Sequence, residues 1–158
     1  MGTTSNYKSI GGVESVALYP AEAVVSALFS SEGCEVELSG TPLEVTLLDD
    51  ASYYEESSHS KYGTTTISHL LHLVAERSDG EEWLDNHFIE RASIEGVVAV
   101  VSLCSGVRLL AGYSAQFGYE QPLRLDSVTA SSGTSPHDTP LVALRLLSHD
   151  TDFSAKIL

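Results

Sequence analysis

The sequence predicts a mainly β, α+β fold, namely an antiparallel β-sandwich or barrel with one flanking α-helix. Three observations point to this class. The apolar segments are short and are separated by turn-forming residues, several of them alternate polar and apolar side chains, and only one segment has clear helical spacing. With 158 residues, 42% of them hydrophobic, the chain can build the core of one domain spanning residues 1–158.

Alternation of side chains predicts the first strands. Residues 35–39 and 43–47 alternate polar and apolar residues on either side of a turn, which is typical of strands with one wet face. Residues 64–77 are rich in Thr, Ile, Leu and Val, and both faces of a strand there would be partly apolar. We therefore expect residues 64–77 to form a long central strand.

Two hairpins are expected in the second half of the chain. Residues 97–103 and 107–113 flank a short Gly-containing connection, and residues 123–129 and 141–147 flank a polar connection of about ten residues. The second connection is too polar to bury a core, so it should project as an exposed loop near residues 130–140. Its candidate subunit-interface residues are Ser131, Ser132, Gly133, Thr134, Ser135, Pro136, His137 and Asp138.

One helix is predicted from Ser78 to about Ile94. Ser78 and Glu81 have the spacing of a capping box, in which each side chain accepts a hydrogen bond from a free backbone N–H of the first turn. Trp83 and Phe88 belong to an apolar stripe that would pack on the sheet. Residues 20–29 are expected to form a second, shorter helix, because Pro suits a first helical turn.

The charge of the chain is strongly negative. The sequence has 8 Lys+Arg against 22 Asp+Glu, a formal net charge of −14. Residues 1–100 hold 17 acids and 4 bases, or −13 of that total. Such a charge repels phosphate backbones and anionic lipid, so we expect neither nucleic-acid groove binding nor attachment to a membrane. The start of the chain lacks the basic and apolar regions of a signal peptide, and synthesis in the cytoplasm is expected.

Four carboxylates form a candidate acidic surface: Asp49, Asp50, Glu55 and Glu56. They could donate oxygen ligands to a cation, but their order differs from that of a calcium-binding loop. A solvated acidic loop is the preferred interpretation.

No motif indicates an enzyme, a cofactor or a metal. Ser148, His149 and Asp150 are the residue types of a catalytic triad, but consecutive residues of an extended chain point to alternate sides. For the same reason His69 and His72 would lie on opposite faces of their strand and would not share a zinc ion. No Gly-rich phosphate loop occurs.

The order of these elements resembles that of a known family. An opening segment at residues 10–18, the segment 62–73, a helix that carries a Trp, the hairpin at 97–113, and the segments 121–125 and 131–134 follow one another. In this order the chain resembles the small tail-tube and related structural proteins of tailed bacteriophages and prophages.

The resemblance implies a non-enzymatic virion protein that assembles with copies of itself into rings, commonly hexameric, which stack into a tube. The loop at residues 131–138 would contact neighbouring subunits, and other virion tail proteins would be partners. DNA would be cargo that passes through, because a negative lumen does not adsorb phosphates. A tail terminator, adaptor or baseplate protein is an alternative within the same class. A small β-sandwich module that binds carbohydrate or a protein partner is the alternative outside it.

Overall fold

The computed structural model describes residues 12–49, 51–116, 118, 120–150 and 152–158. Asp50 and residues 10–11 of the opening segment lie outside these ranges. The strands are β1 (Val13–Pro20), β2 (Val24–Ser30), β3 (Gly33–Leu38), β4 (Leu43–Glu44), β5 (Tyr53–Lys61), β6 (Thr64–Glu76), β7 (Val97–Leu103), β8 (Arg108–Ala111), β9 (Arg124–Ser131), β10 (Leu141–Asp150) and β11 (Ala155–Lys156). The helices are the 3-10 helices η2 (Ala21–Ala23) and η3 (Glu81–Leu84) and the α-helix α1 (Asn86–Ile94).

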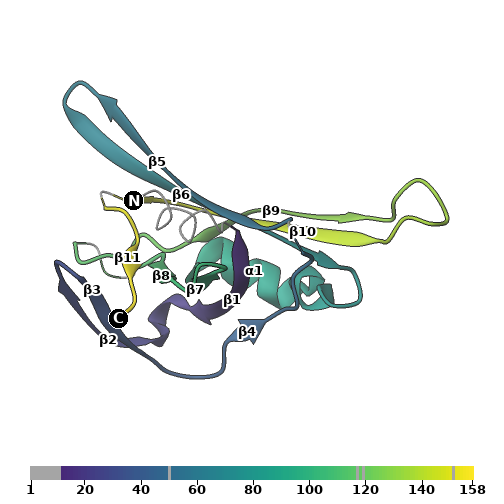
Figure 1. Cartoon of the computed structure of the whole chain (residues 1–158), viewed down its shortest axis with the longest axis horizontal. Helices are drawn as coiled ribbons and strands as arrows, with labels where there is room; N and C mark the ends of the chain where they lie inside the picture. Colours follow the sequence, from purple (N-terminus) through teal and green to yellow (C-terminus); the bar gives the residue numbers. More distant parts are fainter. Residues whose placement is uncertain (1–11, 50, 117, 119, 151) are drawn as a thin grey trace, which may run out of the picture.

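Two antiparallel sheets face each other, which confirms the predicted fold class (Figure 1). A four-stranded sheet has the order β5-β6-β10-β9, and a five-stranded sheet has the order β11-β8-β7-β1-β4. The hairpin of β2 and β3 is a separate two-stranded sheet that packs on the far side of the five-stranded one. In Figure 1 the four-stranded sheet runs along the top of the view and the other elements lie beneath it.

Strand β7 contributes to two cores. Val97 and Val101 point into the main core between the sheets, whereas Val98 points to the opposite side, where it packs with Cys34 and Leu110. The alternation of a strand explains this division, since successive side chains leave opposite faces of the sheet. Burial on both faces also explains why residues 97–101 read as a continuous apolar run.

The pair β6 and β10 forms the other wall of the main core. Leu71 lies opposite Leu146 and Leu73 lies opposite Leu144, and each of these four side chains is at most 1% exposed. Strand β6 is hydrogen-bonded to β5 on one side and to β10 on the other, so the prediction of a central strand is confirmed. The two hairpins predicted in the second half are also confirmed, as β7–β8 and β9–β10.

The four-stranded sheet is longer than the sheet it covers. Strand β6 has 13 residues and β10 has 10, against 7 in β7 and 4 in β8. Beyond the sandwich the hairpins of β5–β6 and β9–β10 project as two arms at opposite ends of the molecule (Figure 1). Residues 58–65 of the first arm are exposed, as are residues 129–140 of the second apart from half-buried Gly133.

The helix predicted from Ser78 to Ile94 is wrong in its first half. Residues 77–80 form a turn, η3 follows, and α1 begins only at Asn86, after Asp85 in an extended conformation. The Ser78 capping box does not form. Trp83 explains the break, because its side chain is 1% exposed and a short 3-10 turn places it in the main core.

The helix predicted for residues 20–29 is also wrong. The chain makes one 3-10 turn, η2, and continues as β2, which pairs with β3. Pairing with β3 buries one side of β2 against the five-stranded sheet, and this tertiary contact outweighs the local preference of the Pro20 turn. The strand predicted for residues 43–47 is only two residues long, as β4.

Truncation of Leu144 should test the main core. Leu144→Ala removes a side chain that is 0% exposed and leaves a cavity in the central pair of strands, so the free energy of unfolding should fall by about 2–5 kcal/mol. Leu28→Ala is the matched control, because Leu28 is 70% exposed, and it should change that free energy by less than about 0.5 kcal/mol. Equal effects in chemical denaturation would contradict the assignment of the core.

Candidate functional site

The candidate acidic surface does not lie on one loop. Asp49 is exposed before β5, whereas Glu55 and Glu56 belong to β5 itself and leave opposite faces of it. Glu55 is exposed, but the side chain of Glu56 is only 13% exposed. The prediction of a solvated loop is therefore wrong for Glu55 and Glu56, because the hydrogen bonds of β5 to β6 extend through both residues.

The candidate interface loop closes around one carboxylate. Asp138 Oδ2 accepts hydrogen bonds from the backbone N–H groups of Thr134 and Ser135, both at 2.9 Å. These two bonds lower the pKa of the Asp138 carboxyl below its usual value. Ser131 is the last residue of β9, and the exposed residues Ser132, Pro136 and His137 form the rest of the loop around Gly133. The loop therefore has a defined shape although it packs on no core.

A polar cluster that the sequence analysis did not find joins β5, β6 and the segment after β10. His69 Nε2 lies 2.9 Å from the carbonyl oxygen of Asp152, so this nitrogen carries the proton and donates it. His69 Nδ1 is then an acceptor, and the Tyr54 hydroxyl donates to it at 2.8 Å. Ser154 bonds the Tyr54 hydroxyl, and the Ser154 N–H donates to Glu56 Oε2 at 2.9 Å.

The cluster is a closed network. His69 is 4% exposed, and both of its ring nitrogens have partners. Burial and the nearby Glu56 carboxylate raise the pKa of the Tyr54 hydroxyl well above its usual range, so Tyr54 stays protonated and donates. A serine, a histidine and a carboxylate meet here. Their hydrogen bonds connect residues 152–154, the segment after β10, to β5 and β6 of the four-stranded sheet. The side chains of the cluster belong to Tyr54, Glu56, His69 and Ser154. These residues are spread over positions 54 to 154, so no short sequence motif could have revealed the cluster.

The sequence contains two histidine motifs, residues 148–150 and the pair His69 and His72. Each places its histidine on the opposite face of a strand from its neighbour in the motif, as predicted. Ser148 is buried and donates to the carbonyl of Gln121 at 2.8 Å, while His149 is exposed and contacts Ser68 at 3.1 Å. His69 and His72 also lie on opposite faces of β6. Among the described residues, no group of three or more His, Cys, Asp or Glu could hold a metal ion.

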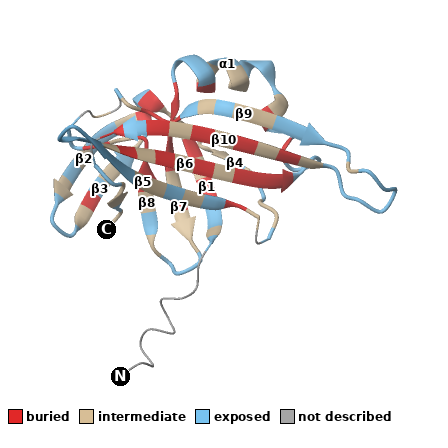
Figure 2. Ribbon diagram, turned by 90° about the horizontal axis from the view of Figure 1, so that it is seen from above, coloured by how far each residue is buried: buried red, intermediate tan, exposed pale blue. Residues whose placement is uncertain are grey.

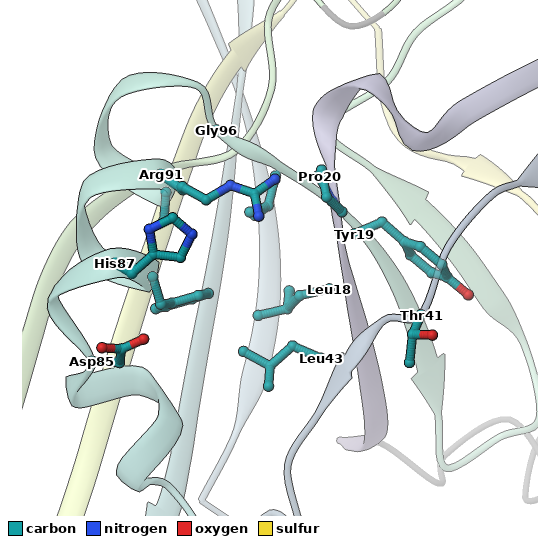
Figure 3. Close-up of a pocket in the computed structure, with 12 residues that line it drawn as sticks. Leu18, Tyr19, Pro20, Thr41, Leu43, Asp85, His87, Arg91 and Gly96 are labelled. Atoms are coloured by element: carbon teal, nitrogen blue, oxygen red, sulfur yellow. The ribbon is translucent and has the colours of Figure 1, made fainter.

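A hollow of about 200 Å³ lies between α1 and the end of β1. Figure 3 shows Leu18 and Leu43 between the helix on one side and β1 on the other, with the guanidinium of Arg91 pointing toward Pro20. The remaining wall of the hollow consists of Tyr19, Thr41, Asp85, His87, Phe88, Ala92, Gly96 and Val97. The interior of the hollow is thus mainly apolar and its charged groups stand on the helix.

The charges at the rim of this hollow are predominantly negative. Arg91 is flanked by Glu22 at 3.8 Å and by Glu95 at 3.6 Å, and Asp85 stands at the start of the helix. Two carboxylates therefore flank the guanidinium, and a third lines the hollow at the start of the helix. Because these side chains are about half exposed or more, the two ion pairs contribute little to stability and leave the rim open to a cation.

A second hollow is larger and polar. It has a volume of about 500 Å³ and lies where β3 and residues 157–158 meet the five-stranded sheet. Glu35 and Glu44 line it, together with Arg108, and both glutamates are exposed. Glu14 and Glu37 are exposed on the neighbouring strand positions of β1 and β3. Exposed carboxylates therefore also stand on β1, β3 and β4, outside the predicted set at residues 49–56.

The side of the four-stranded sheet that faces away from the main core is half-buried and partly apolar. We call it the outer face, and no described helix or strand covers it in Figure 1. Its middle contains Leu70, His72, Ala143, Arg145 and Leu147, all of intermediate exposure. The ring of His72 stacks on that of Tyr53 with 4.9 Å between centroids.

Comparisons with known protein families, with curated proteins and with solved structures found no match to this chain. Within the described part of the chain, no helix is long and apolar enough to cross a membrane.

Removal of the Tyr54 hydroxyl should weaken the polar cluster. Tyr54→Phe removes the donor at 2.8 Å from buried His69 Nδ1 and leaves it only the longer contact of 3.4 Å with the Ser154 hydroxyl, so the free energy of unfolding should fall by about 1–3 kcal/mol. Tyr53→Phe is the matched control, because Tyr53 is 42% exposed on the adjacent position of β5. Denaturant titrations that give the same change for both variants would contradict a stabilising role for the cluster.

The stability of the fold should depend on the protonation of His72. Burial, and then the Arg145 guanidinium opposite it, lower the pKa of the His72 imidazole below its ordinary 6.5. The unfolded chain therefore binds this proton more readily, and the free energy of unfolding should fall as the pH drops below about 6.5. In His72→Gln this fall between about pH 8 and about pH 5 should be shallower, and an unchanged pH profile would contradict the assignment.

Proposed function

We propose that this chain is a non-enzymatic structural subunit of a bacteriophage or prophage tail, which assembles with copies of itself into rings. The observation that carries the proposal is the overhang of the four-stranded sheet, whose two hairpin arms extend beyond the sandwich at opposite ends (Figure 1). An isolated monomer gains little from such arms, because their residues bury almost no surface. A neighbouring subunit would give them contacts.

The edges of the four-stranded sheet support the same proposal. Strands β5 and β9 are its outermost strands, so each presents unpaired backbone groups along one side within the described part of the chain. Two different arms at opposite ends favour head-to-tail contacts between subunits, which close into a ring when the rotation allows it. The half-buried outer face would gain from the same assembly, since a neighbour could remove its leucines from water.

The distribution of carboxylates fits a conduit for DNA. The side of the molecule with the polar hollow carries the exposed Glu35 and Glu44, and Glu14 and Glu37 are exposed on β1 and β3. A ring that turned this side inward would repel phosphates and let DNA pass without adsorption. The loop at residues 131–138 would then serve contacts between subunits or between stacked rings, with other tail proteins at the ends of the stack.

The alternative of a carbohydrate-binding module has weaker support. Pockets for small molecules usually have volumes of about 300–1,000 Å³. The apolar hollow beside α1 has a volume of about 200 Å³. The 500 Å³ hollow is lined by carboxylates and by aliphatic side chains, and Tyr19 is the aromatic residue among those that line it. The apolar hollow is thus smaller than a usual ligand pocket, and the larger hollow lacks the aromatic platform on which sugar rings stack.

Self-association should follow from this proposal. Sedimentation velocity should show a concentration-dependent shift from monomer to a discrete oligomer, and negative-stain electron microscopy of the same sample should show rings. A strict monomer up to about millimolar concentration, where even weak contacts of about 4 kcal/mol would be populated, would contradict it.

A shortened arm should separate assembly from folding. Deletion of residues 132–136 removes loop residues that are exposed apart from half-buried Gly133, and it leaves the β9–β10 pairing from Ser131 and Leu141 inward. The circular dichroism spectrum should therefore be retained while the oligomer weakens. Loss of the folded spectrum would mean that the loop belongs to the core.

A further inference from the structure

The tip of the β5–β6 arm carries an unusual residue. Tyr62 and Gly63 form the two-residue connection between the paired residues Lys61 and Thr64, and their φ angles are +52° and +83°. Positive φ at both positions defines a type I′ turn, for which Asn-Gly is the favoured sequence. Tyr62 is the only residue other than glycine with a positive φ in the described part of the chain.

Tyr62 buries almost no surface against its own subunit. Its side chain is 96% exposed, the most exposed of the large hydrophobic side chains described. A bulky residue with a positive φ costs local strain, and in the folded monomer no burial offsets that strain. The Lys61 ammonium lies 5.5 Å from the centre of the Tyr62 ring, so the tip presents an aromatic ring together with a positive charge.

The hollow beside α1 has the complementary features. Its apolar walls, which include Leu18, Leu43 and Phe88, suit an aromatic ring, and its volume of about 200 Å³ suits one side chain better than a separate ligand. Asp85 and Arg91 line the hollow, and two further carboxylates, those of Glu22 and Glu95, lie within 3.8 Å of Arg91. The carboxylates here outnumber the one guanidinium, so a lysine beside the entering ring would meet opposite charge.

The tip of the arm and the hollow cannot meet within one subunit. In Figure 1 the β5–β6 tip lies at one end of the molecule, whereas α1 lies beneath the middle of the four-stranded sheet, and Figure 2 shows the same separation from above. Any contact between them is therefore a contact between two copies. Because two different surfaces of the subunit meet, the contact is heterologous, and it can repeat from copy to copy and close into a ring when the rotation allows it.

We propose that Tyr62 of one copy of this chain inserts into the hollow between α1 and β1 of the next copy, with Lys61 against the carboxylates of the rim. This inference rests on the proposed self-assembly and names the contact that produces it. The ring of Tyr62 would bury against Leu18, Leu43 and Phe88, and its hydroxyl would stay near the polar groups of the helix. Aromatic anchors that fill a pocket commonly supply most of the binding energy of an interface.

The variant Tyr62→Asn tests the anchor without endangering the fold. It creates the preferred Asn-Gly turn, so the β5–β6 hairpin should be at least as stable as before. The concentration at half-assembly should rise by about tenfold or more. Tyr62→Phe keeps the ring and should stay within about threefold of the unaltered chain. Assembly by Tyr62→Asn at the unaltered concentration would overturn the proposal.

The variant His87→Trp tests the hollow from the other side. His87 is exposed and lines the hollow, so a larger ring there should fill the entrance without disturbing the core. Ser93→Trp is the matched control, since Ser93 is exposed on the same helix but does not line the hollow. We expect His87→Trp to weaken assembly about as much as Tyr62→Asn and Ser93→Trp to leave it unchanged. If Tyr62→Asn acts and His87→Trp does not, the tip occupies another surface and the proposal is wrong.

Cross-linking gives a readout that does not depend on the size of the oligomer. In a Cys104→Ser background, which leaves only the buried Cys34, chains with Tyr62→Cys are mixed with chains with His87→Cys. Mild oxidation should give disulfide-linked pairs in the mixture and far fewer in either variant alone. Absence of these pairs in a sample that forms rings would overturn only this contact, whereas an unaltered chain that stays monomeric would overturn both this contact and the proposed function.

Discussion

The packing of β6 and β10 against β7 and β1 is the interaction on which the rest of the structure depends. Leucines from the first pair and valines from the second meet in one dry layer, and Trp83 closes it at the side of α1. Each strand contributes every second side chain to this layer. The opposite side chains must therefore be covered separately, which is why β7 needs the β2–β3 hairpin and why the outer face of the four-stranded sheet stays half-exposed.

The unequal lengths of the two sheets produce the features that the proposed assembly uses. At about 3.3 Å per residue, the 13 residues of β6 span roughly 43 Å, whereas the 7 residues of β7 span roughly 23 Å. The excess length of β6 leaves the main core in the β5–β6 arm, and the other arm consists mainly of the loop between β9 and β10. A polar cluster around His69 holds the chain end against the base of the β5–β6 arm and so stiffens the point from which that arm projects.

The strands could be predicted where the local pattern and the tertiary packing agree. Residues 64–77 and the two later hairpins alternate or run apolar in the way their burial requires, and the structure contains them. The predictions failed at residues 20–29 and 78–85, because contacts with distant strands decide those segments: pairing with β3 makes β2, and burial of Trp83 makes a 3-10 turn where local spacing favours an α-helix. The prediction of a solvated acidic loop is wrong for Glu55 and Glu56 for the same reason, since β5 pairs with β6 through these residues.

The sequence by itself determined the mainly β class, the position of the long strand and hairpins, and the excess of negative charge, because side-chain period and composition are local properties. Only the tertiary structure decided which groups meet. The polar cluster forms because β5, β6 and the segment after β10 bring Tyr54, His69 and Ser154 together. The hollow beside α1 forms because a space remains between this helix and the end of β1. Tyr62 illustrates the difference: in the sequence it is one tyrosine among seven, and in the structure it is a fully exposed ring with a positive φ at the tip of an arm.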